Sequence, residues 1–326
     1  MGDGDWAGIP RLTPALSTPG GGEGVVTTLV LPSAKGVIET AAADGARLRL
    51  RRHGNPGGPR VFVSHGNGFA ADGYFPFWRH FLDRFDVVVF DMRNHGRNPV
   101  GEATNHNYAH MAGDVATVRD AAAAEFGAKP AIGLFHSMSA QSAMLAADVG
   151  FDALVLFDPP NVPPEPGGPV REKMLAYLAR LTEWAAARRA VFDDPGELAQ
   201  DYAGTGAGRH WAAGSHQSMA RSVLRSEPDG KWRLVCPPAY EADMYAQGVT
   251  VGLWPPRVAI PCPAKLIGGD PERTRPSPTA LANQALAAEH GYDYAAIPGT
   301  GHLLQLEQPE TCAAVALEFL EGIGIR

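Results

Sequence analysis

Serine, histidine and acidic residues stand in this sequence where strand-like runs end, and together these residue types can activate a nucleophile. Ser137 follows the apolar run Ala131–Phe135 and directly precedes a helix-like segment. His302 ends the glycine-rich segment Pro298–His302, after the last strand-like run. A helix N-terminus stabilises negative charge on such a serine, and histidine has a pKa suited to a general base. We therefore expect Ser137 to be a nucleophile and His302 its base; the alternatives are a helix cap and a surface histidine.

The acid that would orient His302 has three candidates. Asp270 ends the strand-like run that precedes the last helix–strand unit, and it is our first choice. Asp158 ends the run Ala153–Phe157 and is the second candidate, and Glu272 is the third. The candidates that are not catalytic would instead cap a loop or form a turn.

An acyl-transfer serine also requires backbone N–H groups that bind the oxyanion. The N–H of Met138, directly after the serine, is expected to be one donor. The other should come from the segment His65–Gly68, where the glycines on both sides of Asn67 leave the backbone free to turn inward. We therefore predict an oxyanion hole made by Asn67 and Met138; otherwise His65–Gly68 is an ordinary tight turn.

The elements that must position these residues alternate between apolar runs and amphipathic segments, which is typical of a parallel sheet covered by helices on both faces. Strands are predicted at Val26–Leu31, Gly36–Thr40, Arg47–Arg52, Arg60–Ser64, Asp86–Phe90, Pro130–Phe135, Ala153–Phe157, Ala264–Ile267 and Tyr292–Ile297. Helices are predicted at Gly73–Phe85, Tyr108–Phe126, Met138–Val149, Pro278–His290 and Glu307–Gly322.

The alternation is interrupted from about residue 160 to residue 261, where the chain is rich in helix-forming and loop residues. We interpret residues 160–261 as a mainly helical cap inserted into one core of residues 25–159 and 262–326, after a flexible N-terminal arm of residues 1–24. The aromatic residues of this cap favour a hydrophobic or aromatic small-molecule substrate, unless they form its own core. They are Trp184, Trp211, Trp232, Tyr240, Tyr245 and Trp254.

Four motifs at these strand ends resemble those of the alpha/beta-hydrolase superfamily. Ser64–Phe69 is similar to its His-Gly oxyanion loop, and Phe90–Arg97 to its Asp-x-Arg-Gly-His-Gly stretch. Gly133–Ser139 is similar to its Gly-His-Ser-Met-Gly elbow, and Gly301-His302 followed by Glu307–Pro309 to its histidine loop and final helix. The order serine, aspartate, histidine is also that of the family. The resemblance implies an α/β fold, with a mostly parallel central sheet flanked by helices, and a Ser-His-Asp hydrolase that needs no metal or organic cofactor.

The sequence departs from the family pattern at several of these positions. Phe135 and Ser139 replace the two glycines of the elbow, so the turn should pack differently. Asn94 stands where the family has glycine, and asparagine tolerates a left-handed backbone. Asp91 and His95 are interpreted as residues that structure their loop.

The resemblance implies a serine esterase that works through an acyl-enzyme, because Ser137 argues against the aspartate-nucleophile members, the epoxide hydrolases and haloalkane dehalogenases. Similar proteins cleave carbon–carbon bonds or carry out cofactor-free perhydrolysis with the same triad, and others use the fold only to bind a ligand. These remain alternatives.

Composition and charge argue against several other classes of protein. The chain has 326 residues and a formal net charge of −7, so it lacks the basic surface typical of nucleic-acid binding. It has no run of eighteen apolar residues and no signal-peptide pattern, so we expect no membrane span and a cytoplasmic location. The sequence leaves the oligomeric state open.

Overall fold

The computed structural model describes residues 30–146 and 150–326. The arm predicted at residues 1–24 lies outside the described residues, as do most of the strand predicted at Val26–Leu31 and the end of the helix predicted at Met138–Val149. Residues 30 and 31 are described and are not in a strand.

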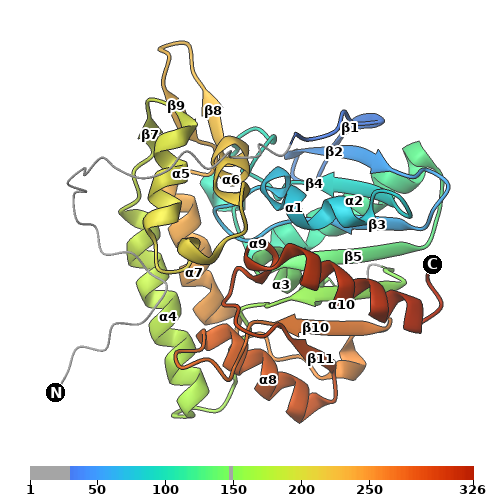
Figure 1. Ribbon diagram of the computed structural model, residues 1–326, viewed down its shortest axis with the longest axis vertical. Helices are drawn as coiled ribbons and strands as arrows, with labels where there is room; N and C mark the ends of the chain where they lie inside the picture. Colours follow the sequence, from blue (N-terminus) through green and yellow to red (C-terminus); the bar gives the residue numbers. More distant parts are fainter. Residues whose placement is uncertain (1–29, 147–149) are drawn as a thin grey trace.

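A central sheet of eight strands, in the order β1-β2-β4-β3-β5-β6-β10-β11, forms the frame of the molecule (Figure 1). β1 and β2 pair antiparallel with each other, β2 pairs antiparallel with β4, and every other pair is parallel. Four central strands are buried along their whole length, because helices cover both faces. The strands are β1 Gly36–Ala41, β2 Arg47–Gly54, β3 Arg60–Val63, β4 Asp86–Phe90, β5 Ala131–His136, β6 Ala153–Phe157, β10 Ala264–Gly268 and β11 Asp293–Ala296.

Two predicted helices of the core are divided in the structure. The segment predicted as one helix at Gly73–Phe85 forms short turns, because its buried aromatic residues are not confined to one helical face. The predicted last helix breaks before Pro309, which cannot continue a helix. The core helices are η1 Ala71–Tyr74, α1 Phe75–Trp78, η2 Arg79–Phe81, η3 Ala103–Asn105, α2 Tyr108–Phe126, α3 Met138–Leu145, α8 Pro278–His290, α9 Leu304–Glu307 and α10 Pro309–Gly322.

The chain between β6 and β10 forms a group of elements that lie together at one side of the large sheet (Figure 1). Besides helices it contains a small antiparallel sheet in the order β7-β9-β8, which the sequence did not predict. The limits 160–261 for a cap stay a prediction. The elements are α4 Pro169–Ala186, β7 Val191–Phe192, α5 Pro195–Gly204, η4 Gly208–His210, α6 Ser215–Val223, β8 Leu224–Ser226, β9 Trp232–Leu234, α7 Pro238–Val251 and η5 Arg257–Ala259.

The order of the central strands reverses at β3, and this reversal positions the candidate site. From β3 the chain first forms β4 on one side of it and then β5 on the other. Ligands of parallel sheets bind where such a reversal opens a crevice at the carboxyl ends of the strands. Directly after β3, the Ser64 N–H donates to Leu134 O at 3.4 Å. The loops that follow β3 and β5 therefore begin side by side.

Across residues 30–146 and 150–326, no helix is both long and apolar enough to pass through a lipid bilayer.

Candidate active site

Ser137 lies on a strained turn between β5 and α3. Its backbone has φ 51° and ψ −114°, a region that L-residues rarely occupy. The turn is held by the Ser137 N–H, which donates to Phe157 O at 2.9 Å. The Ser137 side chain makes no capping hydrogen bond to α3, so the structure does not support a role as a simple helix cap. Its Oγ instead lies 3.0 Å from Nε2 of His302.

The two residues that replace the family's glycines have local compensations. The Phe135 ring occupies space left by Gly133, where a Cβ would lie 2.3 Å from the ring. Ser139 Oγ accepts from His136 N–H at 3.0 Å and donates to His136 O at 2.9 Å. The elbow therefore forms with a phenylalanine and a serine in these positions.

The carboxylate beside His302 belongs to Asp158, and the expectation that Asp270 orients this histidine is wrong. His302 Nδ1 lies 2.7 Å from Asp158 Oδ2. Asp158 follows β6, which is the neighbour of β5 in the sheet, and its N–H donates to Ile267 O of β10 at 2.8 Å. The carboxyl ends of neighbouring parallel strands lie together, so Asp158 and Ser137 both reach the imidazole.

Asp270 holds the loop that carries the imidazole. Its Oδ2 accepts from Gly299 N–H at 2.8 Å and its Oδ1 from Glu272 N–H at 2.8 Å, and its own N–H donates to Thr300 O at 3.0 Å. Both carboxylate oxygens of Asp270 are thus used within its own and the neighbouring loop. The third candidate, Glu272, is exposed.

Two residues of α8 that the sequence analysis missed fix Asp158. Thr279 Oγ1 donates to Asp158 Oδ2, and Asn283 Nδ2 donates to Oδ1 at 3.1 Å. Oδ1 also accepts from Gly269 N–H at 3.3 Å. The sequence did contain a signal for these two residues. Thr279 and Asn283 are four positions apart, so they share a face of α8 that is otherwise apolar and buried. Buried polar side chains need a hydrogen-bond partner, which here is Asp158.

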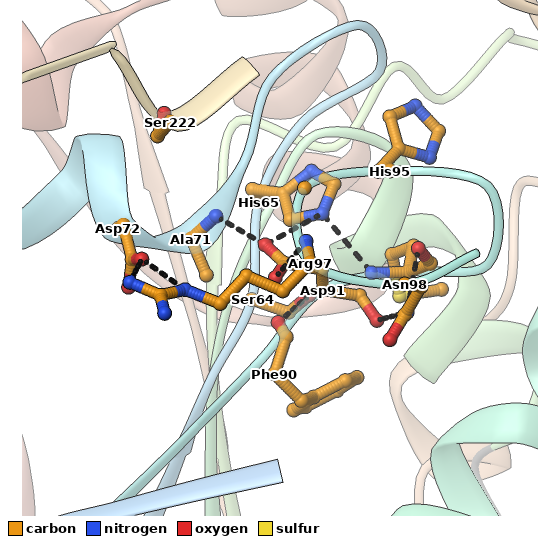
Figure 2. A network of polar contacts seen from close by, with 12 residues as sticks. Ser64, His65, Ala71, Asp72, Phe90, Asp91, His95, Arg97, Asn98 and Ser222 are labelled. Atoms are coloured by element: carbon orange, nitrogen blue, oxygen red, sulfur yellow. Dashed lines mark hydrogen bonds and ion pairs between the residues drawn. The ribbon is translucent and has the colours of Figure 1, made fainter. Parts of the chain in front are cut away.

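The loop after β3, residues 65–68, is held by two buried histidines (Figure 2). His65 Nε2 accepts from Met92 N–H at 3.0 Å, and His95 Nε2 accepts from Gly68 N–H at 3.2 Å. Burial lowers the pKa of His65 to about 4 and that of His95 to about 3. Both rings are therefore neutral at pH 7, as their acceptor nitrogens require.

Asp91 structures the same region, as the sequence analysis predicted (Figure 2). Its Oδ1 accepts from Ala71 N–H at 2.8 Å and its Oδ2 from Arg97 N–H at 3.0 Å. Asn94 has the left-handed backbone expected of it, with φ 63°. The segment 91–97 is thus a support for the loop after β3, and the readings of Asp91, Asn94 and His95 are confirmed.

A buried chain of contacts joins the loop after β3 to the loop of His302. The Gly66 N–H donates to Tyr74 Oη at 3.3 Å, and Tyr74 Oη lies 2.8 Å from His136 Nδ1. His136 Nε2 lies 2.9 Å from His302 O. A carbonyl can only accept, so His136 Nε2 carries the proton and Tyr74 donates to Nδ1. Sequence reasoning missed both residues.

The two segments that carry the amides expected to bind an oxyanion lie at Ser137. α3 begins at Met138, and a Cβ on Gly66 would lie 3.2 Å from Ser137 Cβ. Within the described residues, neither the Asn67 N–H nor the Met138 N–H has a hydrogen-bond acceptor. The side chain of Asn67 donates to Glu241 O of α7 at 2.8 Å, which fixes the loop against the chain inserted between β6 and β10.

A cavity of about 490 Å³ reaches His302. Phe69, α4, the segment 206–210, α7, the first residue of α8 and the loop before it, and the region 301–307 line it. Of the six aromatic residues expected to favour an aromatic substrate, only Tyr245 is part of its wall. Trp211, for example, packs against Tyr202 and Phe69 and belongs to the hydrophobic core.

The sequence and the fold both resemble those of known proteins. The sequence profile described as "Alpha/beta hydrolase family" matches residues 61–315. Epoxide hydrolase A of Mycobacterium tuberculosis is 27% identical, over 87% of this chain and 97% of its own length. The crystal structure of E-2-(acetamidomethylene)succinate hydrolase aligns with a TM-score of 0.70 at 21% identity, over 88% of this chain and all of the other. A thermophilic esterase from Thermogutta terrifontis aligns with a TM-score of 0.60 at 20% identity, over 88% of this chain and 99% of its own.

Proposed function

Since this chain belongs to the alpha/beta hydrolase family, we propose that it is a serine hydrolase that cleaves a carboxylic ester or a related acyl bond. The observation that carries this proposal is the continuous contact from Ser137 Oγ through His302 to Asp158, at 3.0 and 2.7 Å. A nucleophile, a base and an orienting acid at such distances form a catalytic triad.

The proposed reaction has two halves. The Ser137 hydroxyl gives its proton to His302 Nε2 while Oγ bonds to the acyl carbon; the carbon–oxygen bond of the ester then breaks and the alcohol leaves with the proton from His302. Water next gives a proton to His302 and attacks the acyl carbon, which releases the acid and restores the Ser137 hydroxyl. In both halves the Asn67 and Met138 N–H groups bind the oxyanion. Asp158 keeps the imidazole in the required tautomer and orientation.

The relative at 27% identity is named an epoxide hydrolase, and this chain has a different nucleophile. The family members that open epoxides use an aspartate where this sequence has Ser137. A serine oxygen forms an acyl-enzyme with an activated carbonyl, which is the chemistry that an oxyanion hole stabilises. We therefore assign acyl transfer and not epoxide opening.

A fluorophosphonate probe tests the nucleophile, because it phosphonylates an activated serine. We expect the wild-type protein and Ser142→Ala to be labelled, and Ser137→Ala not to be. Ser142 is a suitable control because its hydroxyl donates only to Met138 O within α3, at 2.8 Å. Labelling that survives in Ser137→Ala refutes the assignment.

Turnover of 4-nitrophenyl acetate and butyrate tests the bond. We expect hydrolysis of both esters by the wild-type protein and of neither by Ser137→Ala. A protein that is labelled at Ser137 but hydrolyses no short ester contradicts the esterase assignment, and carbon–carbon substrates should then be tried.

A further inference from the structure

The wall of the cavity at His302 carries an excess of positive charge. Two carboxylates, Glu172 and Glu307, line it, whereas the chain as a whole has a formal net charge of −7. The cationic residues that line it are Lys173, Arg180, Arg209, Arg273 and Arg275.

Several of these cations have no anionic partner in the part of the chain that the structure describes. Lys173, Arg180 and Arg273 form no ion pair with any described carboxylate. The Glu307 carboxylate, which lies in the same cavity, accepts from Gly301 N–H at 3.0 and 3.1 Å. Arg273 lies close enough to Glu307 to lower the pKa of its carboxyl, so the two carboxylates offset the positive charge of the wall only in part.

A second cavity, of about 650 Å³, is lined by five arginines and two carboxylates. It lies over β1, β2 and the loop after β4, away from Ser137. There Arg47 and Arg49 both pair with Glu39, and Arg97 pairs with Asp72. Arg221 and Arg225 of the same wall pair with no described carboxylate. An excess of cations is thus common to both cavities, and the cavity at His302 is the one that reaches the proposed base.

The unpaired cations lie close to the base. Lys173, Tyr177 and Arg180 are spaced by four and three residues on α4, so they share one face of the helix. The Tyr177 ring lies edge-on to the His302 ring, with centroids 6.5 Å apart. In another segment of the wall, Arg273 Nη1 lies 3.2 Å from the position of a Cβ on Gly301, the residue before His302. Cations from two segments therefore lie in the cavity that His302 lines.

Much of the rest of the wall is apolar, with Phe69, Ala176, Pro276 and Leu303 among its residues. We propose that the substrate is an acyl compound with an apolar body and a free carboxylate, and that Arg180 and Arg273 bind this carboxylate. Guanidinium groups bind carboxylates through paired hydrogen bonds, and an apolar surrounding strengthens the attraction. This inference rests on the proposed function, since it concerns the same site.

Binding to the Ser137→Ala variant tests the inference without requiring turnover. Monomethyl adipate carries one carboxylate, and dimethyl adipate is its neutral analogue. By calorimetric titration we expect the monoester anion to bind about tenfold more tightly, and 0.5 M NaCl to reduce the difference. Equal or tighter binding of the neutral diester overturns the inference and leaves the proposed nucleophile untouched.

Kinetics with a matched pair of esters identify the residues. The 4-nitrophenyl monoester of adipate and 4-nitrophenyl 6-methylheptanoate have the same heavy-atom skeleton, with a carboxylate or an isopropyl group at the end. We expect kcat/KM to favour the anionic ester about tenfold, after the uncatalysed rate is subtracted.

Two arginine variants and one control complete this experiment. Arg180→Gln and Arg273→Gln should each lower the preference for the anionic ester several-fold, through KM, and lower kcat/KM on the neutral ester much less. Arg189→Gln removes a cation from the same insertion, where Arg189 pairs with Glu197 and Asp201 outside the cavity, and should have no effect. A preference that survives in both Arg180→Gln and Arg273→Gln contradicts the assignment.

Discussion

Asp158 and Asp270 follow neighbouring strands, β6 and β10, yet their side chains have different surroundings. Asp158 is fully buried, and its carboxylate accepts from His302, Thr279, Asn283 and the Gly269 backbone. Asp270 is partly exposed, and its carboxylate accepts only from backbone N–H groups in the part of the chain described. One carboxylate is aimed at the imidazole, and the other at the loop that carries it.

The comparison shows that a carboxylate at the end of a strand can position a histidine in two ways. It can contact the ring, as Asp158 does, or it can set the backbone that presents the ring, as Asp270 does. The chain order serine, acid, histidine is the same with either acid, so order does not separate the two. The four predictions below test the division, beginning with the largest effect.

Replacement of Asp158 should be the most damaging of the acid substitutions. In Asp158→Asn the amide leaves the imidazole in the wrong tautomer, and we expect kcat on a 4-nitrophenyl ester to fall about 10³–10⁴-fold. Circular dichroism should show an intact fold, because asparagine preserves the shape of the side chain. If Asp158→Asn retains most of the activity, Asp158 is not the orienting acid.

Asp270→Asn should have a much smaller effect. One of the two backbone N–H groups of Gly299 and Glu272 loses its acceptor, which costs about 1 kcal/mol of stability. We expect kcat to fall less than about tenfold, because the His302 loop is only loosened, together with a small decrease in Tm. A loss as large as that of Asp158→Asn would reverse the assignment of the two acids.

Thr279→Val removes one hydrogen bond to Asp158 and preserves the volume of the side chain. We expect a several-fold decrease in kcat with an unchanged KM, and recovery in Thr279→Ser, which restores the hydroxyl. Thr182→Val is the matched control, because the Thr182 hydroxyl donates only to Leu178 O within α4. Equal effects of the two valine variants would mean that Thr279 does not act through Asp158.

Glu307 also contacts the loop that carries His302: its carboxylate accepts from the Gly301 N–H, as that of Asp270 accepts from the Gly299 N–H. We expect this carboxyl group to make the stability of the protein depend on pH. Burial raises the pKa of Glu307 above 4.5. Between pH 4.5 and that higher pKa the folded protein binds more protons than the unfolded chain, so this group lowers stability as pH rises. Glu307→Gln removes the ionisation, and its free energy of unfolding relative to wild type should increase from pH 4 to pH 7.5. Urea unfolding at both pH values measures this; a constant or opposite difference contradicts it.

Much of the frame could be predicted from the sequence because strand and helix signals are local. The limits of β4, β6, α2 and α8 agree with the predicted ranges, since apolar runs and caps mark these elements directly. The small sheet β7-β9-β8 could not be predicted in this way. Its strands have two or three residues each, too few for a periodic pattern.

In the candidate site, too, local sequence signals predicted some residues, whereas contacts between distant residues decided the rest. Residue type and position at a strand end were enough to predict that Ser137 and His302 meet, because strand-to-helix turns and glycine-rich loops are marked in the sequence. The orienting acid was not selected correctly. The choice between Asp158 and Asp270 depends on which carboxyl group has free oxygens facing the imidazole, and this follows from contacts between residues more than a hundred positions apart, such as Asp158 with Thr279 and Asn283.

The sequence by itself determined the family, the elements of the sheet and the residue types available for chemistry, because these follow from local patterns. The tertiary structure decided which acid meets the histidine and that the Tyr74–His136 pair joins two loops of the site. It also decided that cations scattered over three segments line one cavity. Each of these depends on the order of strands in the sheet and on how the chain between β6 and β10 folds back over their ends.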